Sequence, residues 1–483
     1  MSKTDPSSDE QLGPGRMIWG LAWPQLLMMF FHFWIGFFDV YVAGLLNDKV
    51  QASLGIITQT LFFLLIVAMA LSNGAVSAIS QSIGAGKNLR ATRFAGLSLA
   101  IVLGTGVCLL LSGLLFRQSL LNLLQVPSDI RHITDYFLFV YLLLLPVYYL
   151  FIVSNAVFRA QKQVYIPLLA MMITTLFNTF GDFAFCFGLW GFPELGFKGL
   201  AWATFVSVCC GCLFNLLILR SRGWIKPKAL PPWRWIKRGL PYLWRVAWPA
   251  GLMQVLWHTG YLVLFAITAG LPQSPITALA AFTAGLRLES ILFLPAIALN
   301  MTASILVGHY LGRSDFQGAK GIGYRIWAFG VLGISLMGAA LWIAAPSLAD
   351  ILSQKPEVAS EIINYLHFNI LAIPFTATTM IFGGVFIGAG ATRYNMLAIG
   401  GTVWLVRLPL AYLMGHHIFG QATGIWSAML LSQVVQATLM FVLFSVKNWY
   451  RFSLQAQKLA RKTNGVRHAA HFPTSYSGKP KRL

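Results

Sequence analysis

Residues 21–44 read LAWPQLLMMFFHFWIGFFDVYVAG, an apolar run long enough to cross a bilayer as one helix, with one carboxylate, Asp39, inside it. A charged side chain at that depth costs at least about 2–3 kcal/mol, so such a residue is usually protonated, paired or turned towards water. Asp39 is therefore the leading candidate functional residue. Pro24 removes a backbone donor fifteen residues earlier, so we expect this helix to bend there.

The whole chain has the composition of a polytopic membrane protein. Of its 483 residues, 57% are hydrophobic and only 10% are charged, whereas soluble domains carry about 25% charged residues. The polar start lacks the basic stretch and cleavage site of a signal peptide, so the first apolar segment is interpreted as a retained helix. Segments of spanning length predict twelve transmembrane helices, near 19–45, 53–80, 94–116, 134–157, 164–188, 198–219, 246–269, 277–306, 324–346, 362–387, 395–418 and 424–446.

The basic residues predict the orientation. Of the 35 Lys and Arg residues, 28 fall in the N-terminus, the connections that follow even-numbered helices and the C-terminus, and only 5 fall in the opposite loops. The positive-inside rule therefore places both termini in the cytoplasm and the protein in the inner (plasma) membrane. The formal charge of +21 is attributed to this topology and to anionic lipids on the cytoplasmic face, and not to nucleic acid.

The two halves of the chain repeat each other. LAWPQLLM at Leu21 returns as VAWPAGLM at Val246, an offset of 225 residues. Gln81 and Gly84 fall on His309 and Gly312, and Pro146 falls on Pro374, each at an offset of 228. Six helices per repeat is an even number, so the halves have the same orientation and are related by a pseudo-two-fold axis along the membrane normal. A cavity between two such halves is the usual place for a substrate.

The repeat predicts five regions. The N-lobe (residues 19–219) and the C-lobe (residues 246–446) hold six helices each, and a basic, tryptophan-rich cytoplasmic linker at 220–245 joins them. A cytoplasmic segment precedes them at 1–18, and a basic, partly disordered cytoplasmic tail follows at 447–483. The fold predicted is an all-α polytopic membrane protein of two six-helix lobes.

Three acidic residues lie well inside predicted helices: Asp39, Asp182 and Glu289. Asn178 and Asp182 are one turn apart on one helical face, so they point into the same space. In the repeat Asp39 falls on Leu264 and Asp182 on Leu410, which confines the titrating site to the N-lobe. We expect ion coupling there, and the alternative is that the two carboxylates only make fixed polar contacts within the bundle.

Other polar residues inside predicted helices have several interpretations. Arg287 and Glu289 face different directions, so each is expected to pair elsewhere, in a structural or gating role or at a second ion or substrate site. Arg407 lies near a helix end and is interpreted as a snorkelling residue. All five cysteines fall in predicted spans, and the C-x-x-C of Cys209 and Cys212 has no His or acidic partner, so helix packing is preferred to metal or redox chemistry. No cofactor is expected.

Several motifs together resemble one family. They are LAWP with Asp39 in FFDVYVAG, QSIGAGKNLRATR, Asn178 and Asp182 followed by ELGFKGLAWAT, and VGHYLGRSDFQGAK and GAGATR in the second half. Over roughly residues 16–446 the chain resembles the multidrug and toxic compound extrusion (MATE) transporters. The resemblance implies twelve helices in two lobes, no enzymatic activity, and export of organic cations or amphipathic drugs driven by inward flow of H+ or Na+.

The resemblance also implies site residues. Asp39, Asn178 and Asp182 match the N-lobe proton or Na+ site of one branch of the family, and Thr204 in the LAWAT segment matches its threonine. Pro24 matches the helix 1 proline whose bending accompanies proton binding. Another branch has C-lobe carboxylates in helices 7 and 10, at positions that Trp257 and Thr376 occupy here.

The leading hypothesis is a monomeric antiporter that alternates access between its lobes. A flippase for a lipid-linked precursor is the related alternative, although it favours a basic cavity and few basic residues lie at mid-membrane. An intramembrane aspartyl protease is the alternative from another class, because it would use two helix-borne carboxylates as an acid/base pair. Such proteases carry a GxGD pattern, and the first glycine of that pattern is absent before Gly181 and Asp182 here.

Overall fold

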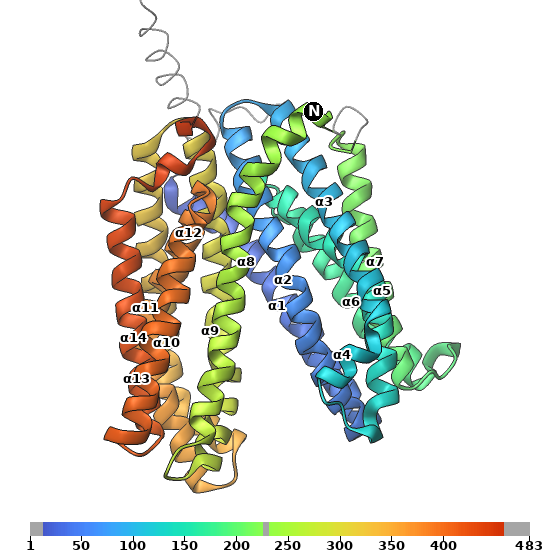
Figure 1. Cartoon of the computed structure of the whole chain (residues 1–483), viewed down its shortest axis with the longest axis vertical. Coiled ribbons are helices and arrows are strands. Elements are labelled where there is room, and N and C mark those ends of the chain that lie inside the picture. Colours follow the sequence, from blue (N-terminus) through green and yellow to red (C-terminus); the bar gives the residue numbers. More distant parts are fainter. Residues whose placement is uncertain (1–12, 226–230, 458–483) are drawn as a thin grey trace, which may run out of the picture.

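The computed structural model describes residues 13–225 and 231–457. The described residues contain twelve helices that are long and apolar enough to span a membrane, and no strand, which confirms the predicted all-α fold (Figure 1). The first six spans are α1 Pro14–Leu46, α2 Asp48–Gly84, α3 Asn88–Leu115, α5 Ser128–Ala160, α6 Tyr165–Phe187 and α7 Phe197–Ser221. The others are α8 Trp233–Ala269, α9 Pro275–Gly312, α10 Phe316–Leu352, α11 Pro356–Ala389, the composite span Thr392–Ile418 and α14 Ala422–Val446.

The composite span is not a uniform α-helix. Between α12 (Thr392–Asn395) and α13 (Leu408–Tyr412) lie the π-helical segments η3 (Met396–Gly400) and η4 (Val403–Arg407), and η5 (Leu413–Ile418) follows α13. Short π segments inside helices are rare and often mark functional positions.

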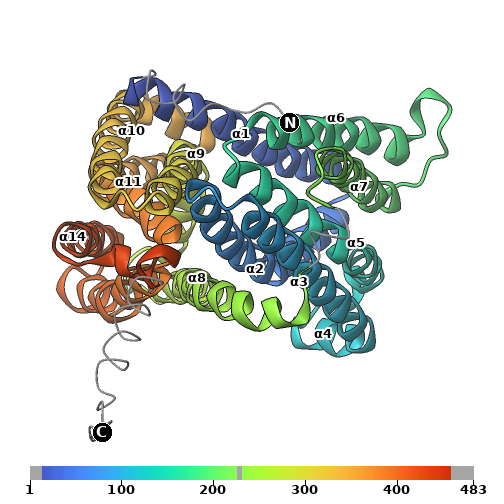
Figure 2. The same ribbon diagram turned by 90° about the horizontal axis from the view of Figure 1, so that it is seen from above.

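The helices form two lobes that come together at one end and diverge towards the other (Figure 1). The lobes meet at the end where both termini of the described chain lie, and we call this the closed end. We call the opposite end the divergent end. α1–α7 form the N-lobe, and α8–α14 form the C-lobe (Figure 2). Each lobe has its own hydrophobic core, built mainly from buried aliphatic and aromatic residues on its own helices. The two-lobe arrangement predicted from the repeat is therefore present.

The first helix of each lobe begins in the other lobe. Leu21 and Ala22 at the start of α1 pack in the C-lobe core, whereas Val42 and Ala43 near its end pack in the N-lobe core. In the second half, Leu243 near the start of α8 packs in the N-lobe core. α1 and α8 lie on opposite sides of the interface between the lobes (Figure 2). Two helices therefore bridge the lobes, and any rocking motion must bend or tilt both.

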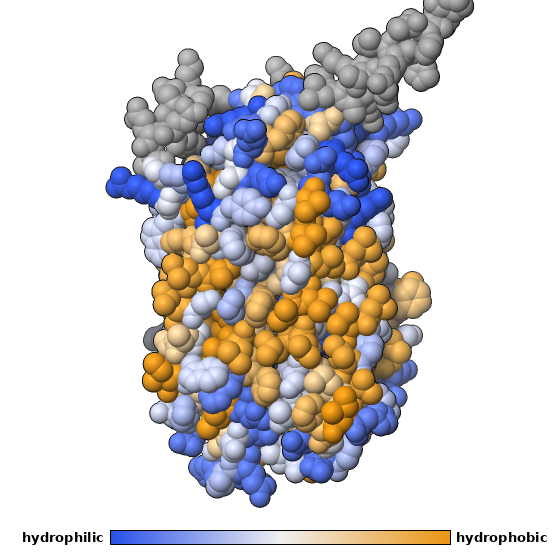
Figure 3. All heavy atoms as spheres, turned by 90° about the vertical axis from the view of Figure 1, so that its left-hand side faces the viewer, coloured by the Kyte–Doolittle hydropathy of each residue, from blue (hydrophilic) through white to orange (hydrophobic). Residues whose placement is uncertain are grey.

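The surface has the pattern expected of a membrane protein. On the face shown in Figure 3, hydrophobic residues cover the middle of the molecule and hydrophilic residues gather at its two ends. Side chains such as Leu405 (79% exposed) and Ile343 (81%) project outward from the spans. Contact with lipid tails satisfies such side chains, so their exposure indicates a bilayer and does not require a protein partner.

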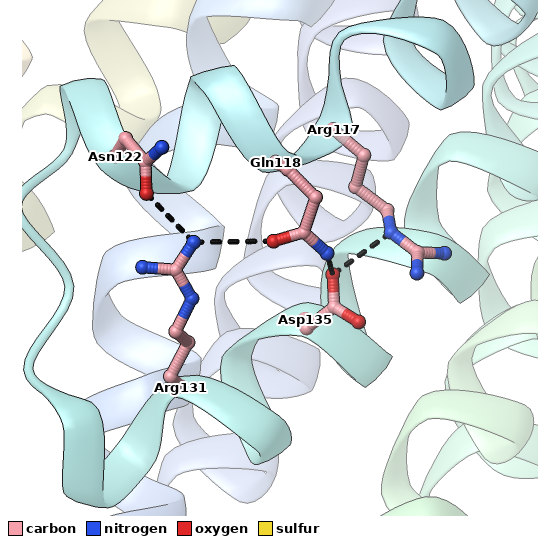
Figure 4. Close-up of polar contacts among 5 residues, drawn as sticks. All are labelled: Arg117, Gln118, Asn122, Arg131 and Asp135. Carbon is pink, nitrogen blue, oxygen red and sulfur yellow. Dashed lines mark hydrogen bonds and ion pairs between the residues drawn. The ribbon is translucent and has the colours of Figure 1, made fainter.

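A polar cluster fastens the short helix α4 (Arg117–Leu123) to the start of α5 at the divergent end (Figure 4). Arg117 forms an ion pair with Asp135 at 2.8 Å, and Arg131 donates to Asn122 at 2.7 Å and to Gln118 at 3.1 Å. The partners of the ion pair are 29% and 26% exposed, so this pair is worth about 1 kcal/mol or less. We interpret the cluster as a local fastening of α4.

The predicted linker at 220–245 adjoins helical structure at both ends. α7 continues to Ser221, and α8 already begins at Trp233, so the second half of this segment is helical and continuous with the seventh span. The tail after Val446 forms η6 (Trp449–Phe452) and a further turn up to Gln457. The predictions for residues 1–12 and for the end of the tail lie outside the described residues.

Candidate functional site

The N-lobe brings the four predicted coupling residues together from three helices. Asn178 of α6 donates from Nδ2 to Oδ1 of Asp39 of α1 at 3.2 Å, and the same nitrogen lies 3.5 Å from Oγ1 of Thr204 of α7. Asp182, one turn further along α6, is close enough to interact electrostatically with Asp39. Asn178 and Asp182 are fully buried, whereas Asp39 is partly exposed. Asp39 is thus the member of the cluster with access to the outside.

The cluster contains more acceptors than donors. Both carboxylate oxygens of Asp182 and Oδ1 of Asn178 are buried and, with both carboxyl groups ionised, have no hydrogen-bond donor among the described residues. Asp182 and Asp39 lie within hydrogen-bonding reach of each other, so a proton on either carboxyl group would join them. Buried acceptors without a partner are costly. Three such oxygens beside a second carboxylate form a site that a proton or a small cation such as Na+ would stabilise.

Close packing of α6 against α7 positions the buried part of this cluster. A Cβ added to Gly199 of α7 would lie 2.5 Å from backbone atoms of Phe185, so only glycine permits this approach. On the other side, Oγ1 of Thr175 donates to the carbonyl of Phe31 on α1 at 3.4 Å. These contacts fix α6 between α1 and α7, which is the arrangement that the cluster requires.

A tyrosine that the sequence analysis missed completes the cluster. Tyr141 of α5 is 4% exposed and interacts with both Thr204 and Asp39. It lies in the apolar run YLLLLPVYYL, where an aromatic residue normally signals packing. Only the packing of α5 against α7 brings this side chain beside the polar site.

The predicted hinge residue lies where α1 leaves the C-lobe. α1 is helical through Pro24, and Nε2 of the next residue, Gln25, donates to the carbonyl of Leu21 at 2.8 Å and to Oγ1 of Thr302 on α9 at 2.9 Å. Gln25 is 1% exposed. The start of α1 is therefore tied to the C-lobe immediately beside the proline.

The C-lobe contains a second buried polar cluster. Its residues differ from the predicted pair of Arg287 and Glu289. Glu289 accepts a hydrogen bond from the hydroxyl of Tyr365 at 2.6 Å, whereas Arg287 is exposed and does not join it. The interpretation of Arg407 as a snorkelling residue is wrong, because it is 1% exposed in the lobe interior. Its Nε donates to Ser432 at 2.9 Å and its guanidinium lies over the ring of Tyr261 at 5.8 Å.

The two clusters occupy related places in the repeat. Ser432 falls on Thr204 at the same offset of 228 residues that relates Gln81 to His309. The two N-lobe carboxylates have no charged counterpart, because Leu264 and Leu410 occupy their places in the repeat. The C-lobe instead carries Arg407 beside Ser432, with Glu289 nearby. Nη1 and Nη2 of Arg407 have no hydrogen-bond acceptor among the described residues. The repeat has therefore kept a polar centre in each lobe while the charges have diverged.

Neither a metal cluster nor a disulfide appears within the described ranges. No group of three or more His, Cys, Asp or Glu side chains is arranged to hold a metal ion there, and all five cysteines are free thiols. The oxygens of Asp39, Asn178, Asp182 and Thr204 are ligands suited to Na+ or to a shared proton.

Comparison with known proteins identifies the family. The MatE family model matches residues 24–184 and again residues 249–413, which together cover more than half of the chain. The two matches begin at Pro24 and Pro249, the prolines that the repeat aligns. A relative described as a probable multidrug resistance protein NorM, from Thermotoga maritima, is 26% identical over 419 residues, covering 86% of this chain and 88% of that protein.

Solved structures share the fold. A MATE structure in the bent conformation has a TM-score of 0.84 at 20% identity and covers 96% of this chain and 100% of that one. A MOP superfamily transporter from Pyrococcus furiosus also has a TM-score of 0.84, at 19% identity, and covers 94% of this chain and 99% of that one. Members of this family are transporters and not enzymes, which rules out the intramembrane protease. From the two family matches and the two-lobe fold, the chain belongs to the MatE family of multidrug and toxic compound extrusion (MATE) transporters.

Proposed function

We propose that this protein is an antiporter that exports organic cations in exchange for H+ or Na+ bound at the N-lobe cluster. The observation that carries the proposal is the trio of buried oxygens without donors on Asp182 and Asn178, beside the partly exposed Asp39. Such a site is incomplete without a proton or cation, and Asp39 gives that ion a route to it. Thr204 and Tyr141 complete its polar wall.

The charge of the N-lobe cluster explains why drug and coupling ion are exchanged. With the site empty of coupling ion, the carboxylate of Asp39 attracts a cationic drug into the space between the lobes. Binding of H+ or Na+ neutralises the site, removes that attraction and favours release of the drug. Because Asp39 lies on α1 beyond Pro24, a change at the site is transmitted to a helix that lacks one backbone donor. We therefore assign Pro24 the role of a hinge.

The available energy is sufficient. Each charge that moves through a membrane potential of 100 mV supplies about 2.3 kcal/mol. In a one-for-one exchange of H+ or Na+ for a monovalent drug cation no net charge moves, so the concentration gradient of the coupling ion drives export, by about tenfold per tenfold ion gradient. Where one more ion than drug charge is exchanged, the potential adds a drug gradient of roughly fifty-fold.

The orientation completes the proposal. The positive-inside rule places both termini in the cytoplasm, and both ends of the described chain lie at the closed end (Figure 1). We therefore assign the closed end to the cytoplasmic side of the inner membrane, which makes this an outward-facing state. We expect the basic residues of the closed end to contact anionic lipids, and we expect the protein to act as a monomer.

The relatives support drugs as the substrate class. The Thermotoga maritima protein is described as a probable multidrug resistance protein, and aromatic side chains such as Trp34 and Phe62 offer surfaces on which flat cations bind. A flippase for a lipid-linked precursor is the second candidate. The buried Arg407 is the one feature that favours it, but this residue is enclosed within the C-lobe.

For the C-lobe cluster we propose a structural role. Glu289 accepts a hydrogen bond from Tyr365 and is 7% exposed, and Arg407 is enclosed, so neither offers an ion a direct route. Arg287, which was proposed with Glu289 as a second polar site, is exposed on α9. We expect it to interact with lipid headgroups or solvent.

The proposal is tested by ethidium efflux from proteoliposomes, under an imposed pH gradient and, separately, an imposed Na+ gradient. Wild type is expected to export under one gradient, which identifies the coupling ion, and Asp39→Asn is expected to lose that export. Absence of export under both gradients would contradict antiport and would direct attention to lipid-linked substrates. Fully coupled export by Asp39→Asn would show that the N-lobe cluster is only structural.

A further inference from the structure

Backbone contact between the two lobes closes one end of the molecule. Near their ends α2 and α9 approach so closely that a Cβ on Gly84 would lie 2.2 Å from the carbonyl oxygen of His309. A Cβ on Gly312 would lie 2.4 Å from the carbonyl oxygen of Gln81. The glycines that the repeat aligns are thus two of the positions at which backbones of the two lobes meet.

Two hydrogen bonds related by the repeat cross this contact. Gln81 of the N-lobe donates from Nε2 to the carbonyl of Gly388 at 2.7 Å, and Nε2 of His309 of the C-lobe lies 2.9 Å from the carbonyl oxygen of Ala160. Both pairs are related by the offset of 228 residues. Each lobe therefore contributes to this contact a side chain and a helix-end carbonyl that the repeat relates to those of the other lobe.

The segment after α14 is anchored to the C-lobe by its first residues. Trp449 is 1% exposed and donates from Nε1 to the carbonyl of Phe444 at 2.9 Å. The ring of Tyr450 packs on Phe316, and that of Phe452 packs on Tyr394. η6 is therefore a fixed part of the C-lobe.

The residues that follow cross to the N-lobe. The backbone N–H of Leu454 donates to Oε1 of Gln81 at 2.7 Å, and the side chain of Leu454 packs against the N-lobe core. Gln455 donates back to the carbonyl of Gly312 at 3.2 Å. Gln81 is fully buried, so without the N–H of Leu454 its Oε1 would lose its partner in a dry interface.

We propose that residues 453–457, a segment we call the latch, fasten the closed end, and that Leu454 must leave Gln81 before the lobes can part there. The latch moves with the C-lobe because η6 is anchored in that lobe. When the lobes separate, the hydrogen bond from Leu454 to Gln81 is therefore the one that breaks. In the orientation proposed above, the latch holds the cytoplasmic side shut in the outward-facing state. It sets how readily the transporter turns inward, independently of which ion is coupled.

Leu454 offers matched variants. Ser453 has φ −65° and ψ 154°, a conformation compatible with a following proline, and Leu454 begins a helical turn, where proline is tolerated. Leu454→Pro removes the N–H that Gln81 accepts, whereas Leu454→Ala keeps that N–H and shortens the side chain. Tyr450→Phe is the control, since it removes a hydrogen bond to Asn448 that stays within the C-lobe.

The test uses spin labels on the full-length protein in lipid nanodiscs, with the native cysteines replaced. Labels at Asn88→Cys and Gln317→Cys lie on exposed positions of the two lobes at the closed end, and double electron–electron resonance measures their separation. Leu454→Pro is expected to raise the ratio of separated to closed molecules about tenfold. Leu454→Ala should have a smaller effect and Tyr450→Phe none.

Two results would overturn the latch. One is a distance distribution for Leu454→Pro that matches wild type. The other is an opening by Tyr450→Phe as large as that by Leu454→Pro. Neither readout depends on transport, so the latch can fail while antiport stands, and antiport can fail while the latch stands.

A second measurement needs no substitution in the latch. Hydrogen–deuterium exchange of the unaltered protein should show that the Leu454 amide loses protection under conditions in which the labelled protein is separated, because this amide donates to the N-lobe. The amides of Ser453 and Gln457 should keep their protection, because they donate to the carbonyls of Tyr450 and Ser453. Retained protection of the Leu454 amide in the separated state would also overturn the proposal.

Discussion

At the scale of single residues, the two N-lobe carboxylates differ in their surroundings. Asp39 is partly exposed and accepts a hydrogen bond from Asn178, whereas Asp182 is fully buried and accepts none from the described residues. Asp39 is therefore the carboxylate that an entering ion contacts first, and Asp182 is the carboxylate that a bound ion stabilises most. The two residues should be required for different reasons.

The first prediction concerns these carboxylates. Asp39→Asn and Asp182→Asn should each reduce gradient-driven ethidium efflux at least about tenfold, because neither amide can exchange a proton or neutralise a cation. Asp182→Asn should also raise the melting temperature in detergent, since it replaces a buried charge with a neutral group. Asp48→Asn, on the exposed first turn of α2, is the matched control and should leave both unchanged. Efflux by Asp182→Asn at the wild-type rate would contradict this assignment.

The second prediction concerns the C-lobe cluster. If Glu289 and Arg407 compensate each other in the lobe interior, removing either leaves the other uncompensated, at a cost of about 3–5 kcal/mol. Glu289→Gln and Arg407→Gln should each lower the melting temperature, and the double variant should be more stable than the sum of the single effects predicts. The coupling free energy should be about 1–3 kcal/mol. Additive effects would show that the two groups are independent.

The sequence allowed part of each cluster to be predicted. Asn178 and Asp182 lie four residues apart on one helix, so helical periodicity alone places them together. Tyr141 and Arg407 could not be placed in this way, because their partners lie on other helices. For Arg407 the distance from a helix end suggested snorkelling, but the neighbouring helices enclose it.

At the scale of helices, the closed end depends on two glycines in close contact. The third prediction is that Gly84→Ala destabilises this end by about 1–3 kcal/mol, because its methyl group would lie within 2.2 Å of the carbonyl oxygen of His309. The lobes should then separate there, as measured by the labels at positions 88 and 317. Gly104→Ala on α3 is the control, since nothing lies within 4 Å of its added Cβ. An unchanged label distance in Gly84→Ala would contradict the described contact.

Hydropathy predicted every membrane span but not the details within and between spans. The twelve predicted segments correspond to the twelve spans, with differences of a few residues at most ends. The helix α4 and the π-helical segments η3, η4 and η5 were not predicted. α4 is too short to show a period, and a π segment depends on packing against α8 and α14 more than on its own residues.

At the scale of the whole molecule, the internal repeat predicted two lobes of like orientation. It could not predict which end would be closed, because a repeat along the membrane normal treats both ends alike. The contacts that decide this are Gln81 with Gly388, His309 with Ala160, and Leu454 with Gln81. The last of these involves a segment outside the repeat, which breaks the symmetry between the lobes.

The central claim is that drug and coupling ion exclude each other through the N-lobe cluster. By linkage, an ion that weakens drug binding must itself be displaced by the drug, to the same extent. The claim is therefore a statement about equilibrium binding, and it can be tested without a membrane gradient.

The most direct measurement is the affinity of purified protein for ethidium, followed by fluorescence anisotropy across pH and, separately, across Na+ concentration. Wild type should bind ethidium more weakly as either H+ or Na+ rises, by about tenfold per tenfold change in the ion if one ion is exchanged. Asp39→Asn should show a flat dependence, and Asp48→Asn should behave as wild type. An affinity of wild type that responds to neither ion, or a full response in Asp39→Asn, would contradict the account.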